Sequence, residues 1–340
     1  MEDSKVPLHS SQKTSWKQCL NILGAYQYVL TFLFMGMFFT FFTIFLLFMP
    51  LWSLSVLYGV WLIIDWDTPQ QGGRSSKWVK KWIIWKYLRD YYPCKLVKTA
   101  ELPPDQNYIL CGHPHGIMCT GHVCNFGTGS TGLFELFPGL RLNIATLTIL
   151  LHLPVYRDYI MAVGMCSVSR QSLDFLLSSR PFGQAVVILV GGAQEALDAI
   201  PGEHRLTLRN RKGFVRLALR HGASLVPVYS FGENDIFRLK RFEVGTWQHT
   251  VQVAFKKISG ISPCIFLGRS LFSPNSWGLL PLPKPITTVV GRPIPVPQVH
   301  QPSEDQVNHY HQLYVSELQQ LFEEHKASYG VSASVQLTFV

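Results

Sequence analysis

Residues 108–116 read Tyr-Ile-Leu-Cys-Gly-His-Pro-His-Gly, and this stretch decides how the chain folds around its chemistry. Its apolar first half predicts a buried strand, and the glycine and proline that follow predict that the strand ends there. Pro114 fixes its own φ and favours an extended backbone at His113. Since side chains two residues apart share a face of an extended chain, His113 and His115 can point into one cleft. Gly116 then allows a sharp turn or a close approach to a ligand.

Two imidazoles at the end of one strand suit proton transfer, because histidine changes its charge close to neutral pH. A structural pair of histidines in a loop is an equally good interpretation of the spacing alone. His113 and His115 are therefore candidate catalytic residues, with His115 as the general base and His113 in support.

A long uncharged block precedes this motif. No charged residue occurs between Lys17 and Asp65, and the apolar core of the block, residues 26–64, exceeds the roughly 20 residues that one membrane-spanning helix needs. Pro50 interrupts the block, so we expect two segments that form a membrane hairpin. Basic residues on both flanks favour the cytosol for both ends. A cleavable signal peptide fits poorly because the block is too long and starts too far into the chain; a pair of buried core helices is the remaining alternative.

The charge and the cysteines agree with this placement. The formal net charge of +9 favours anionic lipids, phosphate-bearing substrates or nucleic acid as partners. We do not expect nucleic acid, because the chain has no zinc-finger spacing, no RNA-binding aromatic signature and no dense basic run. The seven scattered cysteines suit reduced thiols that face the cytosol. We expect no metal, because Cys119-x-x-His122-x-Cys124 lacks a fourth ligand at the usual spacing.

Residues 77–92 alternate cations with aromatic side chains, and Trp78, Trp82, Trp85 and Leu88 recur at helical spacing. This pattern predicts an amphipathic helix at the membrane interface. A helix whose tryptophan face packs on the domain is about equally consistent with it.

From about residue 100, short apolar runs alternate with turn signals and helical stretches such as residues 214–221, which predicts an open α/β sheet. The runs that we interpret as buried strands are residues 107–111, 185–190, 224–230 and 286–290. Ligands bind outside the carboxyl ends of the strands in such sheets. We therefore expect one cleft lined by the segments that follow these strands, residues 113–116, 191–195, 231–235 and 291–293.

Glu195 follows the second of these strands and a pair of glycines, Gly191 and Gly192. Glycines there allow the backbone to approach a substrate closely. A carboxylate on this loop can orient a histidine or stabilise its cation. The alternative is a carboxylate that only complements the start of a helix.

Arg211, Lys212 and Arg216 form a basic cluster at the start of the predicted helix 214–221. Cations at a helix start oppose the helix dipole, so an anion such as phosphate would relieve that cost. A solvated helix face is the alternative. The chain has no Gly-x-Ser-x-Gly elbow, no P-loop and no Gly-x-Gly-x-x-Gly after a strand, which leaves acyl transfer from a phosphate-bearing carrier to a lipid hydroxyl as the best-supported chemistry.

Six stretches resemble the type-two diacylglycerol acyltransferase family, which includes monoacylglycerol and wax-alcohol acyltransferases. They are residues 113–116, 153–160, 190–196, 211–214, 226–235 and 291–293. The likeness is greatest to the 2-acylglycerol O-acyltransferases, to which residues 97–105 are also similar. Related glycerol-phosphate acyltransferases carry an aspartate five residues after the histidine, whereas this chain has Met118 and Thr120 there, so Glu195 is our candidate orienting carboxylate.

The resemblance implies a multi-pass enzyme of the endoplasmic reticulum membrane whose catalytic domain faces the cytosol. It implies fatty acyl-CoA as co-substrate, no separate cofactor, and monoacylglycerol and diacylglycerol as acceptors. The motif at residues 113–116 would be catalytic, with Gly116, Gly191, Gly192, Arg157, Arg211, Lys212 and Arg216 binding the substrates. A wax-ester-forming acyltransferase and a non-catalytic lipid-binding protein of the same fold stay open as alternatives, as does the formation of homo-oligomers.

We thus expect an α/β protein in which an N-terminal membrane helical hairpin precedes an open α/β acyltransferase domain. Its regions are a polar tail at residues 1–20, the hairpin at 21–65, an interfacial amphipathic segment at 66–100 and the acyltransferase domain at 101–340.

Overall fold

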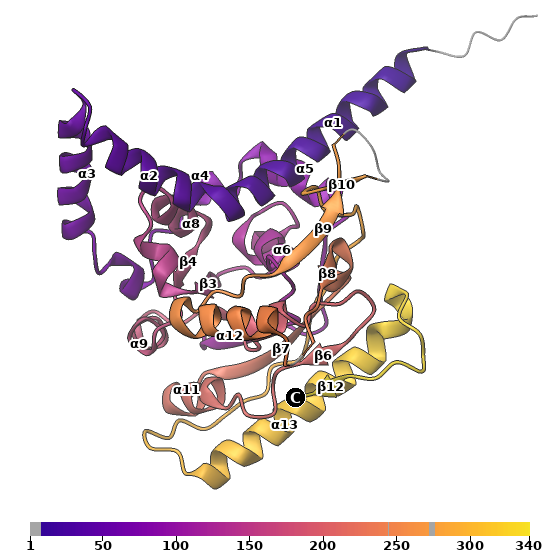
Figure 1. Cartoon of the computed structure of the whole chain (residues 1–340). Coiled ribbons are helices and arrows are strands. Elements are labelled where there is room, and N and C mark those ends of the chain that lie inside the picture. The colour runs from indigo at the N-terminus through magenta and orange to yellow at the C-terminus, as the bar shows by residue number, and fades with distance from the viewer. Residues whose placement is uncertain (1–7, 244, 272–275) are drawn as a thin grey trace, which may run out of the picture.

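A seven-stranded sheet forms the centre of the structure, a computed structural model that describes residues 8–243, 245–271 and 276–340 (Figure 1). From one edge to the other its strands are β1 (Lys95–Lys98), β11 (Thr287–Val290), β7 (Ser224–Phe231), β2 (Tyr108–His113), β5 (Gln184–Leu189), β3 (Arg141–Thr146) and β4 (Met165–Ser167). The four strands predicted from the sequence are all present as β2, β5, β7 and β11, which confirms the α/β class.

Strand β2 lies at the middle of this sheet and is buried along its whole length. It runs parallel to β5 and β7, with Leu110 opposite Val187 and Val226. Because successive side chains of a strand point to opposite faces, Ile109 joins one hydrophobic core and Leu110 the other. Strand β2, which ends in His113, is therefore packed against a hydrophobic core on each face and hydrogen-bonded to a strand on each side.

Three helices cover one face of the sheet, α9 (Arg170–Ser178), α11 (Gly213–His221) and α13 (Glu304–His325). A capping box begins α13, since Ser303 and Gln306 bond each other's backbone amides. The buried face of α13 includes Val307, Tyr314 and Leu318, as its helical spacing predicts. The other face of the sheet packs against η3 (Val123–Gly127) and α7 (Leu133–Leu136).

Strand β11 corrects one expectation. It pairs antiparallel with β7, so Val290 at its carboxyl end lies opposite Val228 rather than beyond Phe231. Residues 291–293 therefore lie at the amino-terminal ends of β2 and β7, whereas the histidine motif lies at the carboxyl end of β2. The prediction that residues 291–293 line the same cleft is wrong.

The N-terminal block forms one long helical run and one shorter helix. The run comprises α1 (Leu8–Leu30), the π-helical turn η1 (Thr31–Met35) and α2 (Gly36–Leu46), and it crosses one end of the molecule (Figure 1). Among the described residues, Trp16–Leu46 is the one helix long and apolar enough to cross a membrane. After a break around Pro50, α3 (Trp52–Ile64) has 13 residues, fewer than the roughly 20 that span a bilayer. A hairpin that crosses the membrane twice therefore stays a prediction. Residues 1–7 of the predicted tail lie outside the described residues, whereas residues 8–20 are already helical.

The predicted helix at residues 77–92 is divided into α4 (Lys77–Lys80) and α5 (Ile83–Tyr91). Trp85 and Leu88 are buried against α1, so this part of the segment packs on the protein, while Trp78 stays 72% exposed and its place at a membrane interface stays a prediction. A Cβ at Gly24 of α1 would lie 2.8 Å from the backbone nitrogen of Leu88. The glycine thus permits the close crossing of α1 and α5.

Shorter elements complete the chain: η2 (Thr68–Gln71), α6 (Thr120–His122), η4 (Thr148–His152), α8 (Tyr156–Val163), α10 (Ala193–Ala196), β6 (Arg205–Leu206), η5 (Glu233–Ile236), β8 (Arg238–Lys240), α12 (Trp247–Ser259), β9 (Ile265–Arg269), β10 (Trp277–Gly278), η6 (Lys326–Tyr329) and β12 (Thr338–Phe339).

A buried ion pair ties the end of α3 to α8. The guanidinium of Arg157 donates to the Asp65 carboxylate at 2.7 Å and to the Asp65 carbonyl at 2.8 Å, and both side chains are almost fully buried. Arg74 reaches the same carboxylate at 2.7 Å and also pairs with Asp158, which is partly exposed. The Nε–H of Arg157 donates to the Leu151 carbonyl. The guanidinium therefore fastens α3 to the α/β domain.

Replacing Asp65 with asparagine should destabilise the protein by about 3–5 kcal/mol, because it leaves the buried Arg157 without its counter-charge. Asp158→Asn is the matched control and should cost less than about 1 kcal/mol, since its partner Arg74 is partly exposed. Thermal unfolding in detergent would compare the two. Equal losses of stability would show that Arg157 does not depend on Asp65.

Candidate active site

His113 ends strand β2 in a fully buried position. Its Nε2 lies 3.0 Å from the hydroxyl of Tyr314 on α13, and that hydroxyl donates to the Cys111 carbonyl. The other ring nitrogen, Nδ1, is buried, has no hydrogen-bond partner among the described residues, and lies 3.9 Å from the Glu195 carboxylate. His113 therefore contributes to the wall of the site and is not open to solvent.

His115 is partly exposed and is held in one tautomer. Its Nδ1 lies 2.9 Å from the Gly116 carbonyl, which can only accept a hydrogen bond, so Nδ1 carries the proton and Nε2 is unprotonated. Burial lowers the pKa of His115, although the Gly116 carbonyl and the charge of Glu195 act in the opposite direction. At neutral pH the ring is therefore an uncharged base with Nε2 available.

Cys119 lies against this ring, with Sγ 3.4 Å from Nε2 of His115. Burial raises the pKa of the Cys119 thiol well above its ordinary value, and the nearby carboxylates of Glu233 and Glu195 add to that effect. The thiol is therefore neutral at physiological pH. His122 is buried behind the same segment, and burial lowers its pKa to about 3, so it stays uncharged as well.

Glu195 follows β5 and the glycine pair, as predicted, but it lies in the first turn of the short helix α10 rather than in a loop, and it is almost fully buried. One carboxylate oxygen accepts the amide of His115 at 2.9 Å and the other accepts the amide of Thr207 at 2.8 Å. A Cβ at Gly191 would lie 1.9 Å from the Glu195 carboxyl carbon, so Gly191 provides the room for this side chain. Glu195 thus holds the backbone of the histidine motif, and the nearest imidazole to it is that of His113.

A second buried carboxylate, Glu233, holds the other end of the same segment. Its two oxygens accept the amides of Thr120 and Gly121, each at 2.7 Å. Gly116 has φ +62°, and a Cβ there would lie 2.6 Å from Cγ of Glu233, so Gly116 makes room for a carboxylate as Gly191 does. Burial raises the pKa of Glu233 to about 8 despite the two amide donors, which lower it.

Neither Glu233 nor Tyr314 is among the catalytic or binding residues that the sequence predicts, although Glu233 lies in a segment expected to line the cleft. Glu233 follows strand β7 within the segment 231–235, so the signal that identifies Glu195 could have identified it. Tyr314 lies on the buried face of α13, and nothing in the neighbouring sequence marks its hydroxyl.

The membrane-helix candidate also contacts this segment. The buried hydroxyl of Tyr28 on α1 donates to the carbonyl of Met118 at 2.7 Å. Met118 lies in the segment 115–121, between the end bonded by Glu195 and the end bonded by Glu233. A helix near the N-terminus thereby supports the loop that carries His115.

The predicted basic residues line a groove of about 520 Å³ beside the sheet. It runs between α9 and α11, and Ile188 and Val190, at the end of β5, form part of its wall together with Arg211, Lys212 and Arg216. Within this set Arg216 is already paired, at 2.6 Å, with Glu304. The groove therefore combines an apolar wall at the sheet with positive charge farther out.

Two predicted substrate-binding residues have other surroundings. Arg157 is buried, and its guanidinium is bonded to Asp65 and to the Leu151 carbonyl. Gly192 begins α10 with φ +57° and leaves space around its Cα. Among the described residues no group of three or more histidine, cysteine or carboxylate side chains could hold a metal ion.

Glu233→Gln should remove a pH dependence of stability. Because the folded protein keeps the Glu233 proton up to about pH 8 while the unfolded chain releases it near its ordinary pKa of 4.5, wild-type stability is full below that lower value and is lost as the pH rises through this window. Glutamine mimics the protonated carboxyl. The melting temperature of the wild type should therefore fall relative to that of the variant between pH 5 and pH 8.5, on the order of several degrees.

Glu135→Gln, at an exposed glutamate of α7, is the matched control and should follow the wild type. Parallel melting curves for wild type and Glu233→Gln across that range would contradict the prediction.

Comparison with known proteins agrees with the resemblance in the sequence. A family profile described as diacylglycerol acyltransferase matches residues 44–340. Human 2-acylglycerol O-acyltransferase 3 is 68% identical over 331 residues, which are 97% of this chain and 97% of that protein. Diacylglycerol O-acyltransferase 2 is 49% identical in Danio rerio, over 93% of this chain and 87% of that protein, and 48% identical in Homo sapiens, over 92% and 80%.

A solved structure, that of the 1-acyl-sn-glycerophosphate acyltransferase PlsC from Thermotoga maritima, aligns with a TM-score of 0.41 at 14% identity over 91% of this chain and 97% of that chain. The profile and the sequence relatives show that this chain belongs to the diacylglycerol acyltransferase family and is an acyltransferase.

Proposed function

We propose that the chain is a membrane-bound acyl-CoA:2-monoacylglycerol O-acyltransferase that makes diacylglycerol and also acylates diacylglycerol to triacylglycerol. The observation that carries the chemistry is His115, a neutral imidazole with Nδ1–H bonded to the Gly116 carbonyl and an unprotonated Nε2 that lies 3.4 Å from the Cys119 thiol. The acceptor class rests on the relative that is 68% identical and is named a 2-acylglycerol O-acyltransferase.

In this mechanism Nε2 of His115 removes the proton from the acceptor hydroxyl. The hydroxyl oxygen then attacks the thioester carbonyl, and the tetrahedral intermediate collapses as the carbon–sulfur bond breaks. The CoA thiolate leaves and takes the proton back from the imidazolium. The products are an ester and free CoA, and no covalent enzyme intermediate is needed.

Glu195 supports this step through position and charge. It fixes the amide of His115, and its negative charge raises the pKa of that imidazole, which favours the cation formed during the reaction. His113 and Tyr314 close the site behind it. The proposal therefore gives His115 the proton transfer, and Glu195 and His113 supporting roles.

The groove between α9 and α11 is the proposed site of the donor. Acyl-CoA carries negative phosphates, and Arg211 and Lys212 lie on the rim of the groove whose apolar end reaches the strand that precedes Glu195. Arg216 adds to this charge only in competition with its partner Glu304. Gly192 leaves room for a substrate beside the carboxylate loop.

The lipid substrates reach the site from the membrane. Phe38, Phe41 and Phe45 are more than half exposed along α2, which suits contact with lipid rather than with water. With Tyr28 on the same helical run bonded to the active-site segment, acceptor hydroxyls in the bilayer lie close to the reaction. We place the protein in the endoplasmic reticulum membrane, with the catalytic domain in the cytosol.

The proposal is tested with labelled oleoyl-CoA offered with 2-monoacylglycerol, diacylglycerol or hexadecanol, followed by separation of the products. Diacylglycerol as the main product from 2-monoacylglycerol supports it. Wax ester as the main product would favour the alcohol acyltransferase, and the absence of any ester would contradict the acceptor assignment.

His115→Ala should lower turnover by roughly a hundredfold or more, the usual loss when a general base is removed. The KM for acyl-CoA should change little, because the imidazole acts on the acceptor. His300→Ala, at an exposed histidine far along the chain, should behave as wild type. Near-normal turnover of His115→Ala with normal protein yield would remove this histidine from the mechanism.

If residues 21–65 form a hairpin, single cysteines at residue 5 and at Ser334 should both react with an impermeant thiol reagent in sealed microsomes, because both ends face the cytosol. The other cysteines, Cys19 included, would be replaced first, and detergent would give the full extent of labelling. Protection of one site but not the other would mean a single crossing of the membrane.

A further inference from the structure

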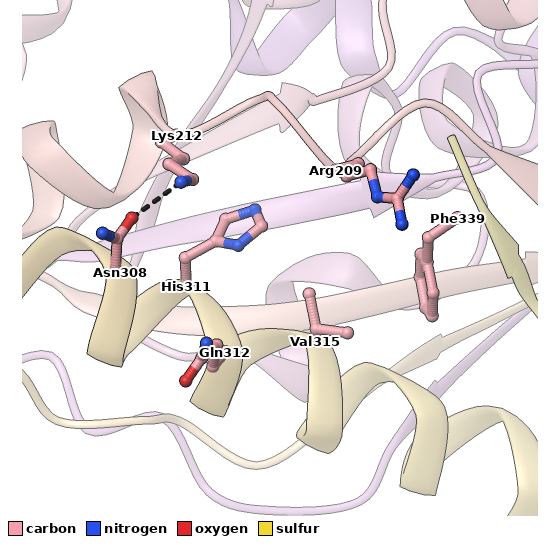
Figure 2. A pocket seen from close by; sticks show the side chains of 7 residues that line it. All are labelled: Arg209, Lys212, Asn308, His311, Gln312, Val315 and Phe339. Carbon is pink, nitrogen blue, oxygen red and sulfur yellow. Dashed lines mark hydrogen bonds between the residues drawn. The ribbon is translucent and has the colours of Figure 1, made fainter.

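A second groove, of about 410 Å³, lies on the far side of the basic loop from the proposed donor groove. Figure 2 shows Arg209 and Lys212 on one wall, and Asn308, His311 and Val315 of α13 on the other, with the ring of Phe339 at one end. The wall shared by the two grooves is Lys212, which lines both.

In the described part of the chain, no side-chain carboxylate is bonded to the two cations of this groove. Among the described residues the guanidinium of Arg209 forms no hydrogen bond or ion pair, in contrast to Arg216 and Arg220, which pair with Glu304 and Asp174. Lys212 is held by the neutral side chain of Asn308, with Nζ 2.6 Å from Oδ1, so its charge is oriented and not cancelled. An arginine and a lysine around one concave site suit a phosphate group.

Flat rings accompany these charges. Phe339 stands across the groove from His311, whose Nε2 lies 3.1 Å from the Leu208 carbonyl and so donates to it. Burial lowers the pKa of His311, which keeps the ring uncharged. A phenyl ring beside two cations suits a nucleotide, because the base can stack on the ring while the phosphates form ion pairs with the cations.

The position of the groove favours a water-soluble ligand over a lipid headgroup. Helix α13 and strand β12, which carry its far walls, lie at the end of the molecule opposite the α1–α2 helix (Figure 1). Tyr314, one helical turn beyond His311, bonds His113 at the candidate active site. A donor whose thioester lies at His115 would therefore cross the first groove and reach the second with its other end.

We propose that this second groove binds the 3′-phosphoadenosine end of acyl-CoA, with Arg209 contacting the 3′-phosphate and Phe339 packing against the adenine. This rests on the proposed function in taking acyl-CoA as the donor. Arg211 and Lys212, on the rim of the first groove, remain the partners of the pyrophosphate.

The test compares oleoyl-CoA with oleoyl-3′-dephospho-CoA as donors for the full-length enzyme in membranes, with 2-monoacylglycerol as acceptor. Removing the 3′-phosphate should raise the wild-type KM about tenfold or more, the scale of one hydrogen bond to a charged group. Arg209→Gln should raise the KM for oleoyl-CoA by the same factor, leave kcat nearly unchanged, and abolish the difference between the two donors. Arg292→Gln removes a like charge from the opposite edge of the sheet and should retain the full difference.

Binding of adenosine 3′,5′-bisphosphate, measured by thermal unfolding, tests the site without depending on turnover. It should protect the wild type against thermal unfolding, and Arg209→Gln should remove most of that protection. A variant that still discriminates fully between the donors, or whose KM rises equally for both, would overturn the assignment. Loss of all activity with both donors in the wild type would instead contradict the proposed function.

Discussion

Two buried carboxylates hold the segment that carries His115, one at each end. Glu195 bonds the amide of His115, and Glu233 bonds the amides of Thr120 and Gly121. Each carboxylate follows a strand that is a direct neighbour of β2 in the sheet, β5 on one side and β7 on the other. The parallel register of these three strands thus brings both carboxylates to the end of β2, and the backbone of the segment is fixed by the sheet itself.

Glycines make this arrangement possible. Gly116 and Gly191 each lie where a Cβ would overlap one of the two carboxylates. In this structure these glycines therefore make room for a protein side chain. Glycine-rich loops usually also allow a substrate to approach the backbone closely. The imidazole of His115 takes its tautomer from the next carbonyl in the chain, which leaves Nε2 as the unprotonated nitrogen, and the Cys119 thiol lies against the same ring.

The sequence predicts those parts of the fold that have a local signal. Strands β2, β5 and β7 are apolar runs bounded by glycine, helix α11 has an apolar face, and α13 begins with a capping box. The direction of β11 has no local signal, because it depends on pairing with β7, whose residues are distant in the chain. Strands β1 and β4 are short, and β1 carries a lysine at each end, which hides it among the surrounding turns.

The same distinction applies to the site. Glu195 is predictable from its place after a strand and a glycine pair, and Glu233 occupies an equivalent place after β7, within residues 226–235, which also resemble the family. The bonding of Arg157 to Asp65 could not be predicted, because an ion pair between residues 92 positions apart leaves no pattern in the chain. Neither could the bond from Tyr314 to His113, which only the packing of α13 on the sheet creates.

The hydrogen bond from Tyr28 to the Met118 carbonyl gives the long N-terminal helix a second structural role. This helix supports the segment that carries His115, and it is also long and apolar enough to cross a membrane. A truncated form that begins after α2 would lose a support of the segment that carries His115 together with the candidate membrane helix. Failure of such a truncation to turn over substrate would therefore say nothing about whether the chemistry needs a membrane.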